Sequence, residues 1–245
     1  MRILGPRLLI FLSVSIGGGS LVLFAYFLLF GVPFAIRIAH SHAARLGWDS
    51  LLCLAFFLQH SGMIRRSAKA RLARQVPTTY YPAFYSIASG TTLCALILLW
   101  QPSTEFLFGL HGPAPWLSVS LSGLAVAGFA WGAHSLHGFD PLGTLALRGD
   151  LRGAAKPSAA FVASGPYRYV RHPLYLCMLL LLWSTPRLST DQLLFNVLWT
   201  AWIVIGAKLE ERDLLVEFGE RYWLYQRHVP MLIPSPRVFS RKWRT

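Results

Sequence analysis

Charged residues are scarce in this chain of 245 residues, and the acidic ones are the scarcest. Lysine, arginine, aspartate and glutamate make up 13% of the sequence, with only 10 acidic side chains, whereas 54% of the residues are apolar. The mean hydropathy is +0.47. So few charges cannot cover the surface of an ordinary soluble domain. The composition therefore excludes that class and predicts a membrane protein with several spans.

Cysteine is rare, and two familiar sequence signals are missing. Cys53, Cys94 and Cys177 are scattered through apolar stretches. They form neither a disulfide framework nor a metal-binding pattern, so we interpret them as small core residues. No strand–GxGxxG–helix unit is found, which argues against a Rossmann domain. The first apolar run is too long for a cleavable signal peptide and is expected to be a true span.

Long apolar runs are what the sequence has in quantity. A helix needs about 20 mostly apolar residues to cross a bilayer. We expect an all-α, polytopic transmembrane bundle of about six spans in one integral domain. The fifth run is short, so it either tilts, thins the bilayer, or forms a hairpin with the sixth that does not fully cross. The expected spans are 8–36, 48–64, 80–100, 116–136, 174–186 and 193–207.

The basic residues are numerous and unevenly distributed. The formal net charge is +13, which raises the question of nucleic-acid binding. With six spans, however, 20 of the 23 lysines and arginines fall on one side of the membrane. This positive-inside asymmetry predicts an integral protein of the bacterial inner membrane with both termini in the cytoplasm. It favours the lipid bilayer as partner over nucleic acid, and it leaves the oligomeric state open.

Three segments outside the spans carry their own signals. Residues 65–74 (RRSAKARLAR) predict a surface helix on the cytoplasmic leaflet. Residues 140–162 contain three glycines and two prolines without periodicity, which predicts a loop. Residues 210–228 predict a C-terminal cytoplasmic helix over the mouth of the bundle, because apolar residues recur at intervals of three and four. The recurring residues are Leu214, Leu215, Phe218, Tyr222 and Tyr225.

Two adjacent glutamates, Glu210 and Glu211, follow the sixth apolar run. A carboxylate at the edge of the hydrocarbon is costly unless it pairs or meets water, which makes it a candidate functional group. The alternative is snorkelling or pairing with Lys208 and Arg212. We favour a functional role for Glu210 and the alternative for Glu211 and Asp213.

The stretch 165–175 (GPYRYVRHPLY) concentrates arginine, histidine and tyrosine side chains at the expected edge of the bilayer. Pro173 and Leu174 begin an apolar helix, whose free backbone N–H groups form an anion pocket with the guanidiniums of Arg168 and Arg171. Three tyrosines offer rings and hydroxyl groups. The combination suits a ligand with an aromatic ring, a carboxylate and a positive centre. A simple interfacial belt of arginine and tyrosine is the alternative.

Two of these motifs also carry a family resemblance. SGPYRYVRHPLY, followed by LEERDLLVEFGERYWLYQRHVPMLIP, resembles the membrane methyltransferase superfamily that includes isoprenylcysteine carboxyl methyltransferases and phospholipid N-methyltransferases. Within it, the chain looks most like methanethiol S-methyltransferases. The upstream LQHSGMIRR resembles the same subgroup and the NnrU-like membrane proteins, so the likeness extends more weakly over most of the chain.

The resemblance implies S-adenosylmethionine as methyl donor, bound at the cytoplasmic side by a C-terminal core at 159–234 that follows N-terminal spans at 1–140. Glu210 would face the positive end of the methionine moiety, and residues 159–162 would pass the cofactor through their backbone. Glu210, Arg171 and His60 are the candidate catalytic residues. The candidate cofactor-binding residues are Ala159, Ala160, Phe161, Val162, Tyr167, Arg168, His172, Pro173, Leu174, Tyr175 and Glu210.

The chain departs from the family pattern at positions that bear on the acceptor. Isoprenylcysteine methyltransferases have an arginine one turn before the glutamate, where this chain has Gly206, and a carboxylate-binding pocket needs such a fixed cation. The sequence also reads Tyr81-Pro82-Ala83 and HGFDPLG (137–143) where the methanethiol subgroup usually differs, and Cys177 where the family commonly has glycine.

Histidines supply the remaining candidates. His60 could help a thiol of pKa about 8.5 to lose its proton, or it could be a structural histidine bonded to a neighbouring helix. His134, His137 and Asp140 have a spacing that could bind a metal, but two histidines are too few, and we expect no metal site.

Together, these features predict an S-adenosylmethionine-dependent methyltransferase that methylates a small hydrophobic thiol such as methanethiol. The first alternative is a lipid-like acceptor, either isoprenylcysteine or a phospholipid amine. The second is a non-catalytic, NnrU-like membrane protein.

Overall fold

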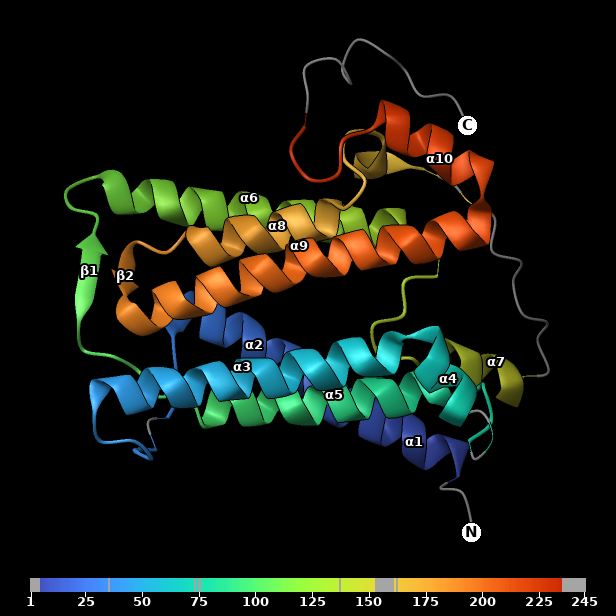
Figure 1. Cartoon of the computed structure of the whole chain (residues 1–245), viewed down its shortest axis with the longest axis horizontal. Coiled ribbons are helices and arrows are strands. Elements are labelled where there is room, and N and C mark those ends of the chain that lie inside the picture. The colour runs from blue at the N-terminus through green and yellow to red at the C-terminus, as the bar shows by residue number, and fades with distance from the viewer. Residues whose placement is uncertain are drawn as a thin grey trace. The chain divides into compact units, whose positions relative to one another are not determined.

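The computed structural model describes residues 5–34, 36–72, 74, 76–136, 138–152, 161 and 163–234, without the side chains of 66 and 67. These residues are predominantly helical, as the sequence predicts (Figure 1). The chain divides into two compact units. One comprises Met1–Glu105, Asp140–Pro157 and Ser189–Phe195, and the other comprises Phe106–Phe139, Ser158–Leu188 and Asn196–Thr245.

Four helical stretches among the described residues are long and apolar enough to cross a membrane, judged by length and composition. They are Pro6–Phe30, Tyr81–Leu98, Ala114–Ser135 and Thr190–Phe218. Two further helices match the other expected spans. The helix α3 (His42–Ile64) is long but less apolar, and α8 (Pro173–Trp183) is apolar but has only 11 residues.

The first unit is organised around a close approach of small residues. Its N-terminal helix runs through α1 (Pro6–Leu12), a π-helical stretch (Ser13–Gly18) and α2 (Gly19–Phe30), and it packs against α5 (Tyr81–Leu98). A Cβ atom built on Gly90 would lie only 2.9 Å from the Cα atom of Gly17. Glycine at both positions therefore lets the two backbones approach closely, as is common between membrane helices. The helices α3, α4 (Arg66–Leu72) and α7 (Leu145–Leu151) complete this unit.

The second unit holds the predicted cofactor-binding core. The helix α6 (Ala114–Ser135) packs along α8, and α8 runs antiparallel to α9 (Thr190–Phe218). Hydrogen bonds tie α8 to α9 near both of its ends: Tyr175 bonds Glu210, and Trp183 bonds Thr200. The short helix α10 (Glu220–His228) follows α9 (Figure 1). The last two apolar runs therefore lie antiparallel; whether they fully cross a bilayer stays a prediction.

Several boundaries differ from the expectation. The final predicted helix, 210–228, is wrong as one helix. The helix α9 runs on to Phe218, and Gly219, with φ +57°, separates it from α10. Only glycine adopts that backbone conformation readily, so the chain turns there. The predicted loop 140–162 contains the helix α7. Two short strands, β1 (Phe106–Gly109) and β2 (Arg187–Ser189), pair in segments where no strand was expected.

Candidate functional site

The predicted ligand-binding stretch begins with a tight turn against the end of α6. Gly165 has φ +54°, and a Cβ atom there would lie 2.1 Å from the hydroxyl oxygen of Ser135. Glycine is therefore required both by the backbone angle and by the space. The Ser164 hydroxyl donates to the Ser135 carbonyl at 2.8 Å. This anchor fixes the 3₁₀ turn Gly165–Arg168, which carries Tyr167.

The next residues pair with a segment far along the chain. The backbone N–H of Arg171 donates to the Pro230 carbonyl at 2.9 Å, and that of His172 donates to the Met231 carbonyl at 3.1 Å. His172 is then the N-cap of α8, and Pro173 occupies the first turn, where a missing N–H costs nothing. The Arg-His-Pro motif is thus held from both sides, by its own helix and by residues after α10.

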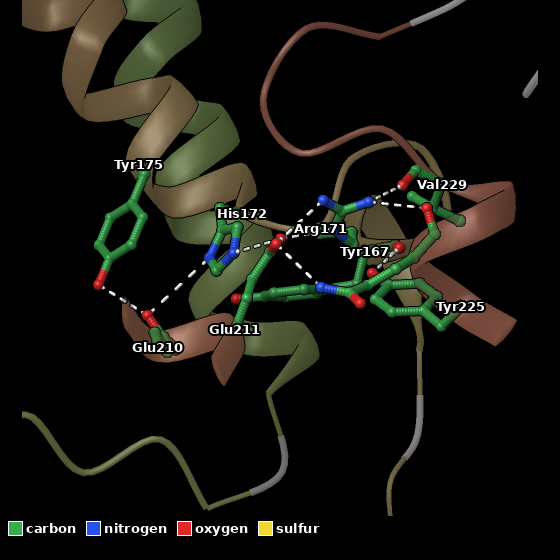
Figure 2. A network of polar contacts seen from close by, with 9 residues as sticks. Tyr167, Arg171, His172, Tyr175, Glu210, Glu211, Tyr225 and Val229 are labelled. Atoms are coloured by element: carbon green, nitrogen blue, oxygen red, sulfur yellow. Dashed lines mark hydrogen bonds and ion pairs between the residues drawn. The ribbon is translucent and has the colours of Figure 1, made fainter. Parts of the chain in front are cut away.

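An ion pair lies at the centre of the site (Figure 2). Nε and Nη2 of Arg171 donate to the two carboxylate oxygens of Glu211 at 2.6 and 3.1 Å. Nη1 of Arg171 donates to the carbonyls of Gln226 and Val229. The side chains of Arg171 and Glu211 are each only 11% exposed. Glu211 therefore pairs with Arg171, not with Lys208 or Arg212 as the favoured interpretation of the sequence had it.

His172 lies between the two adjacent glutamates. Its Nε2 is 3.2 Å from Oε1 of Glu211, and its Nδ1 is 3.9 Å from Oε2 of Glu210. Its ring stacks on that of Tyr175, with centroids 5.3 Å apart and an angle of 10° between the planes. Figure 2 shows both glutamates reaching toward the imidazole from α9. His172 itself is buried, whereas Glu210 keeps 47% of its side chain exposed.

Glu210 is the accessible carboxylate of the site. The Tyr175 hydroxyl donates to its Oε2 at 2.8 Å. No lysine or arginine lies within ion-pair distance of it among the residues that the structure describes. A carboxylate that is held in place, accessible and not neutralised by a guanidinium suits an organic cation as partner.

Aromatic residues of α10 hold the Tyr167 turn in place. The Tyr225 hydroxyl donates to the Tyr167 carbonyl, and Phe161 packs against the rings of Tyr222 and Tyr225. Burial raises the pKa of Tyr167, and the nearby Glu210 carboxylate raises it further. Burial likewise raises the pKa of Tyr225. Both hydroxyl groups thus remain protonated at neutral pH, and that of Tyr225 acts as a hydrogen-bond donor.

The structure brings most of the predicted cofactor residues together. Tyr167, His172, Tyr175 and Glu210 gather around the start of α8, where Leu174 packs against Gly132 of α6. Arg168 is exposed on the 3₁₀ turn. All three side-chain nitrogens of Arg171 bond within the chain, so its guanidinium does not form the expected anion pocket beside Arg168. Ala159, Ala160 and Val162 lie outside the described residues.

His60, the remaining catalytic candidate, belongs to the first unit. Its Nε2 lies 2.8 Å from the Tyr85 hydroxyl, and its ring packs against Phe56. The possible metal group does not form one cluster that can be described. His137 lies outside the described residues, and Oδ2 of Asp140 accepts the backbone N–H of Leu145.

Sequence reasoning assigned no functional role to Glu211, and it did not consider Gln226 and Val229. Gln226 donates from Nε2 to Glu211 at 3.0 Å, and the Val229 carbonyl accepts from Arg171. Helical periodicity relates neighbours three or four residues apart, but these partners are separated by 15 to 58 residues. No local sequence signal identifies these partners.

Comparisons with known proteins place this site in a family. The isoprenylcysteine carboxyl methyltransferase (ICMT) family matches residues 150–213, which include Arg171, His172 and both glutamates. A methanethiol S-methyltransferase from a Pseudomonas species is 36% identical over 194 residues, covering 76% of this chain and 72% of that protein. The chain belongs to the same methyltransferase family as this relative.

Other relatives extend the match. The methanethiol S-methyltransferase of Mycobacterium tuberculosis is 29% identical over 237 residues, covering 92% of this chain and 97% of that protein. Nurim from Xenopus laevis is 24% identical over 265 aligned positions, covering 91% of this chain and 89% of that protein. No solved structure matches the chain. The family likeness predicted from the two C-terminal motifs is confirmed, and so is the prediction of a membrane methyltransferase.

Proposed function

We propose that the protein transfers the methyl group of S-adenosylmethionine to a small thiol such as methanethiol, giving a thioether. The observation that carries this proposal is the accessible, oriented Glu210 carboxylate beside the His172–Tyr175 ring stack. It lies within the segment that matches a methyltransferase family. The names of the relatives add the acceptor, since several of them are methanethiol S-methyltransferases.

The residues of the site fit S-adenosylmethionine. Its methionine part carries an ammonium group, which suits the Glu210 carboxylate. Its adenine ring suits an aromatic surface such as Tyr167 or the stacked rings at the start of α8. Its carboxylate needs a cation, and Arg168 is the exposed arginine of the motif, because Arg171 is engaged by Glu211. When bound, it supplies a methyl group on a positively charged sulfur, whose charge is lost as the methyl leaves.

The chain's own residues would orient the reactants and exclude water. The Tyr175 hydroxyl holds the Glu210 carboxylate in one direction, and Tyr225 and Ser135 hold the two ends of the Tyr167 turn. Fixing two reactants in this way lowers a barrier by several kcal/mol, on the order of 7–11 in well-oriented model reactions. A dry, low-dielectric setting also disfavours a charged ground state relative to a transition state in which that charge disperses.

Gly206 supports a small acceptor. It lies one turn before Glu210 on α9, and within the described residues no atom outside its own helix lies within 4 Å of where a Cβ would be. A carboxylate-bearing acceptor would need a fixed cation in such a place, and glycine offers none.

His60 stays a proposed proton acceptor for the thiol. Its replacement by alanine should lower kcat and leave the affinity for the methyl donor unchanged.

A lipid-like acceptor is the second candidate, because the matching segment belongs to the isoprenylcysteine carboxyl methyltransferase family. The two candidates differ in the acceptor and share the methyl donor. Purified protein should therefore receive S-adenosylmethionine carrying a labelled methyl group, together with methanethiol, a prenylcysteine or phosphatidylethanolamine.

Labelled dimethyl sulfide in the headspace is the expected product. A labelled methyl ester of prenylcysteine, or a methylated phospholipid, would transfer the proposal to the lipid-like acceptor. If S-adenosylmethionine produced no heat on titration and none of the three acceptors were methylated, the enzyme proposal would fail. The non-catalytic alternative would then stand.

A further inference from the structure

Glu211 is the most heavily bonded acidic side chain of the site, yet the proposed function gives it no task. It accepts hydrogen bonds from Arg171, His172 and Gln226. The Glu210 side chain beside it is 47% exposed and accepts from Tyr175. Successive residues of a helix point about 100° apart, so the two carboxylates serve different sides of His172.

The Glu211 carboxylate determines which nitrogen of His172 carries the proton. An ionised carboxylate only accepts hydrogen bonds, and the bidentate contact with Arg171 keeps Glu211 in that form. Nε2 of His172, 3.2 Å from Glu211, must therefore be the N–H donor. In a neutral imidazole the other nitrogen, Nδ1, then has a lone pair and can only accept.

Two hydrogen-bond acceptors consequently face each other across the accessible side of His172. They are Nδ1 of His172 and Oε2 of Glu210, 3.9 Å apart. The Tyr175 hydroxyl already donates to that glutamate oxygen. Two acceptors at this separation are too far apart to bond each other, and a single group with several N–H donors satisfies both. A primary ammonium group has three N–H donors and the matching charge.

We infer that Glu211 is a positioning residue of the methyl-donor site. By taking the Nε2 proton of His172, it leaves Nδ1 as an acceptor that binds the donor's ammonium group together with Glu210. The inference rests on the proposed function, because it assumes a ligand with an amino-acid part. Among the described residues, the titratable groups shown against His172 are Glu210, Glu211 and Tyr175, and Arg171 bonds the far side of Glu211.

A matched pair of ligands separates positioning from a structural role. S-adenosylhomocysteine and 5′-methylthioadenosine are both nucleosides with an uncharged thioether sulfur. Only S-adenosylhomocysteine has the amino-acid part with its ammonium group. In Glu211→Gln the affinity for S-adenosylhomocysteine should fall roughly tenfold or more, because a charge-assisted contact is misplaced. The affinity for 5′-methylthioadenosine should not change. Glu217→Gln, an exposed glutamate on the same helix, is the control and should alter neither.

Equal weakening of both ligands would overturn the inference, because it would show general damage to the site. Unchanged binding of both ligands would overturn it as well. If wild-type protein bound neither ligand, the proposed function would fail instead. The two failures are thus distinguishable.

A spectroscopic measurement tests the tautomer of His172 directly and does not depend on ligand binding. In protein labelled with ¹⁵N-histidine, the His172 signals, assigned with His172→Asn, should show Nε2 protonated and Nδ1 unprotonated at neutral pH. A protonated Nδ1 in the ligand-free protein would contradict the inference.

A second variant covers misfolding, since removing one partner leaves the other charge buried. The double variant Arg171→Met/Glu211→Leu removes both charges together. It should fold, give a mixture of His172 tautomers and bind S-adenosylhomocysteine roughly tenfold or more weakly. If it keeps the wild-type tautomer and affinity, Glu211 does not position His172.

Discussion

At the scale of single residues, the two adjacent glutamates have opposite environments. Glu211 is 11% exposed and bonded on several sides, whereas Glu210 is 47% exposed and bonded by Tyr175 and close to His172. Under the proposed function, the Glu210 carboxylate is available to a cationic ligand, whereas the Glu211 carboxylate balances the buried charge of Arg171.

Replacement of Glu210 by glutamine tests the available carboxylate. The amide oxygen can still accept from Tyr175, so the fold should be retained, but the negative charge that faces the ligand is lost. We expect the Kd for S-adenosylmethionine to rise roughly tenfold. Isothermal titration measures this, with Glu217→Gln as control. An unchanged Kd would show that another group binds the ammonium.

Part of this site could be predicted from the sequence. The ring-rich turn and the helix start at Pro173 have local signals, and Glu210 stood out because a charge at the end of an apolar run is expensive. The ion pair of Arg171 could not be predicted. Its partner Glu211 lies 40 residues away, and the sequence offered nearer basic residues to pair with it. The tertiary fold decided between them.

At the scale of elements, the break at Gly219 positions α10. The residue joins two helices whose apolar faces form one cluster with Phe161 and Tyr167. The residues whose spacing predicted a helix here, Leu214, Phe218, Tyr222 and Tyr225, all belong to that cluster. It missed the break, because the apolar spacing continues across the glycine and the signal of a single glycine is weak.

The conformation of Gly219 can be tested with alanine. A Cβ at φ +57° and ψ −129° is strained, so Gly219→Ala should cost about 1–3 kcal/mol of stability, seen as a lower Tm in detergent. Gly123→Ala in α6 is the control. It has no neighbour within 4 Å in the described part of the chain and should be neutral or slightly stabilising. Equal Tm values for the two variants would contradict this account.

The contact between α6 and α8 accommodates a buried cysteine. Cys177 is buried, and a Cβ atom on Gly128 would lie 2.8 Å from its Sγ atom. The glycine on one helix therefore leaves room for the thiol on the other.

Substitutions at Gly128 and Cys177 should show that the two residues share this space. Gly128→Ala should lower stability by about 1 kcal/mol through overpacking. In the double variant with Cys177→Gly, the loss of stability should be smaller than the sum of the two single losses, because the thiol that the new methyl group meets is gone. Thermal unfolding of the single and double variants measures the coupling. Additive losses would mean that the two positions do not share this space.

At the scale of the whole molecule, several contacts join loops that the charge distribution assigns to the same side. The strand β1 pairs with β2, and the Gln101 side chain accepts from the backbone of Ile38. The predicted six-span arrangement assigns all these segments to the side with three basic residues. It assigns Arg171 and Pro230, whose backbones are hydrogen-bonded, to the basic side.

The orientation itself stays a prediction and can be measured with reporter fusions. Alkaline phosphatase is active only outside the cytoplasm. We expect high activity when it is fused after Gly112, between α5 and α6, and low activity when it is fused after Gly149 in α7. A fluorescent protein at the same positions should give the reverse pattern. High phosphatase activity at both positions would refute the six-span arrangement.

During synthesis the site can form only after Gln226 and Val229 have been added, because their carbonyls accept hydrogen bonds from Arg171. The ribosome adds about 5–20 residues per second, and 55 residues separate Arg171 from Gln226. Roughly 3 to 11 seconds therefore pass between the synthesis of Arg171 and that of Gln226, the first of its two carbonyl acceptors. A nascent chain halted within α9 would still lack both carbonyl acceptors of the arginine side chain.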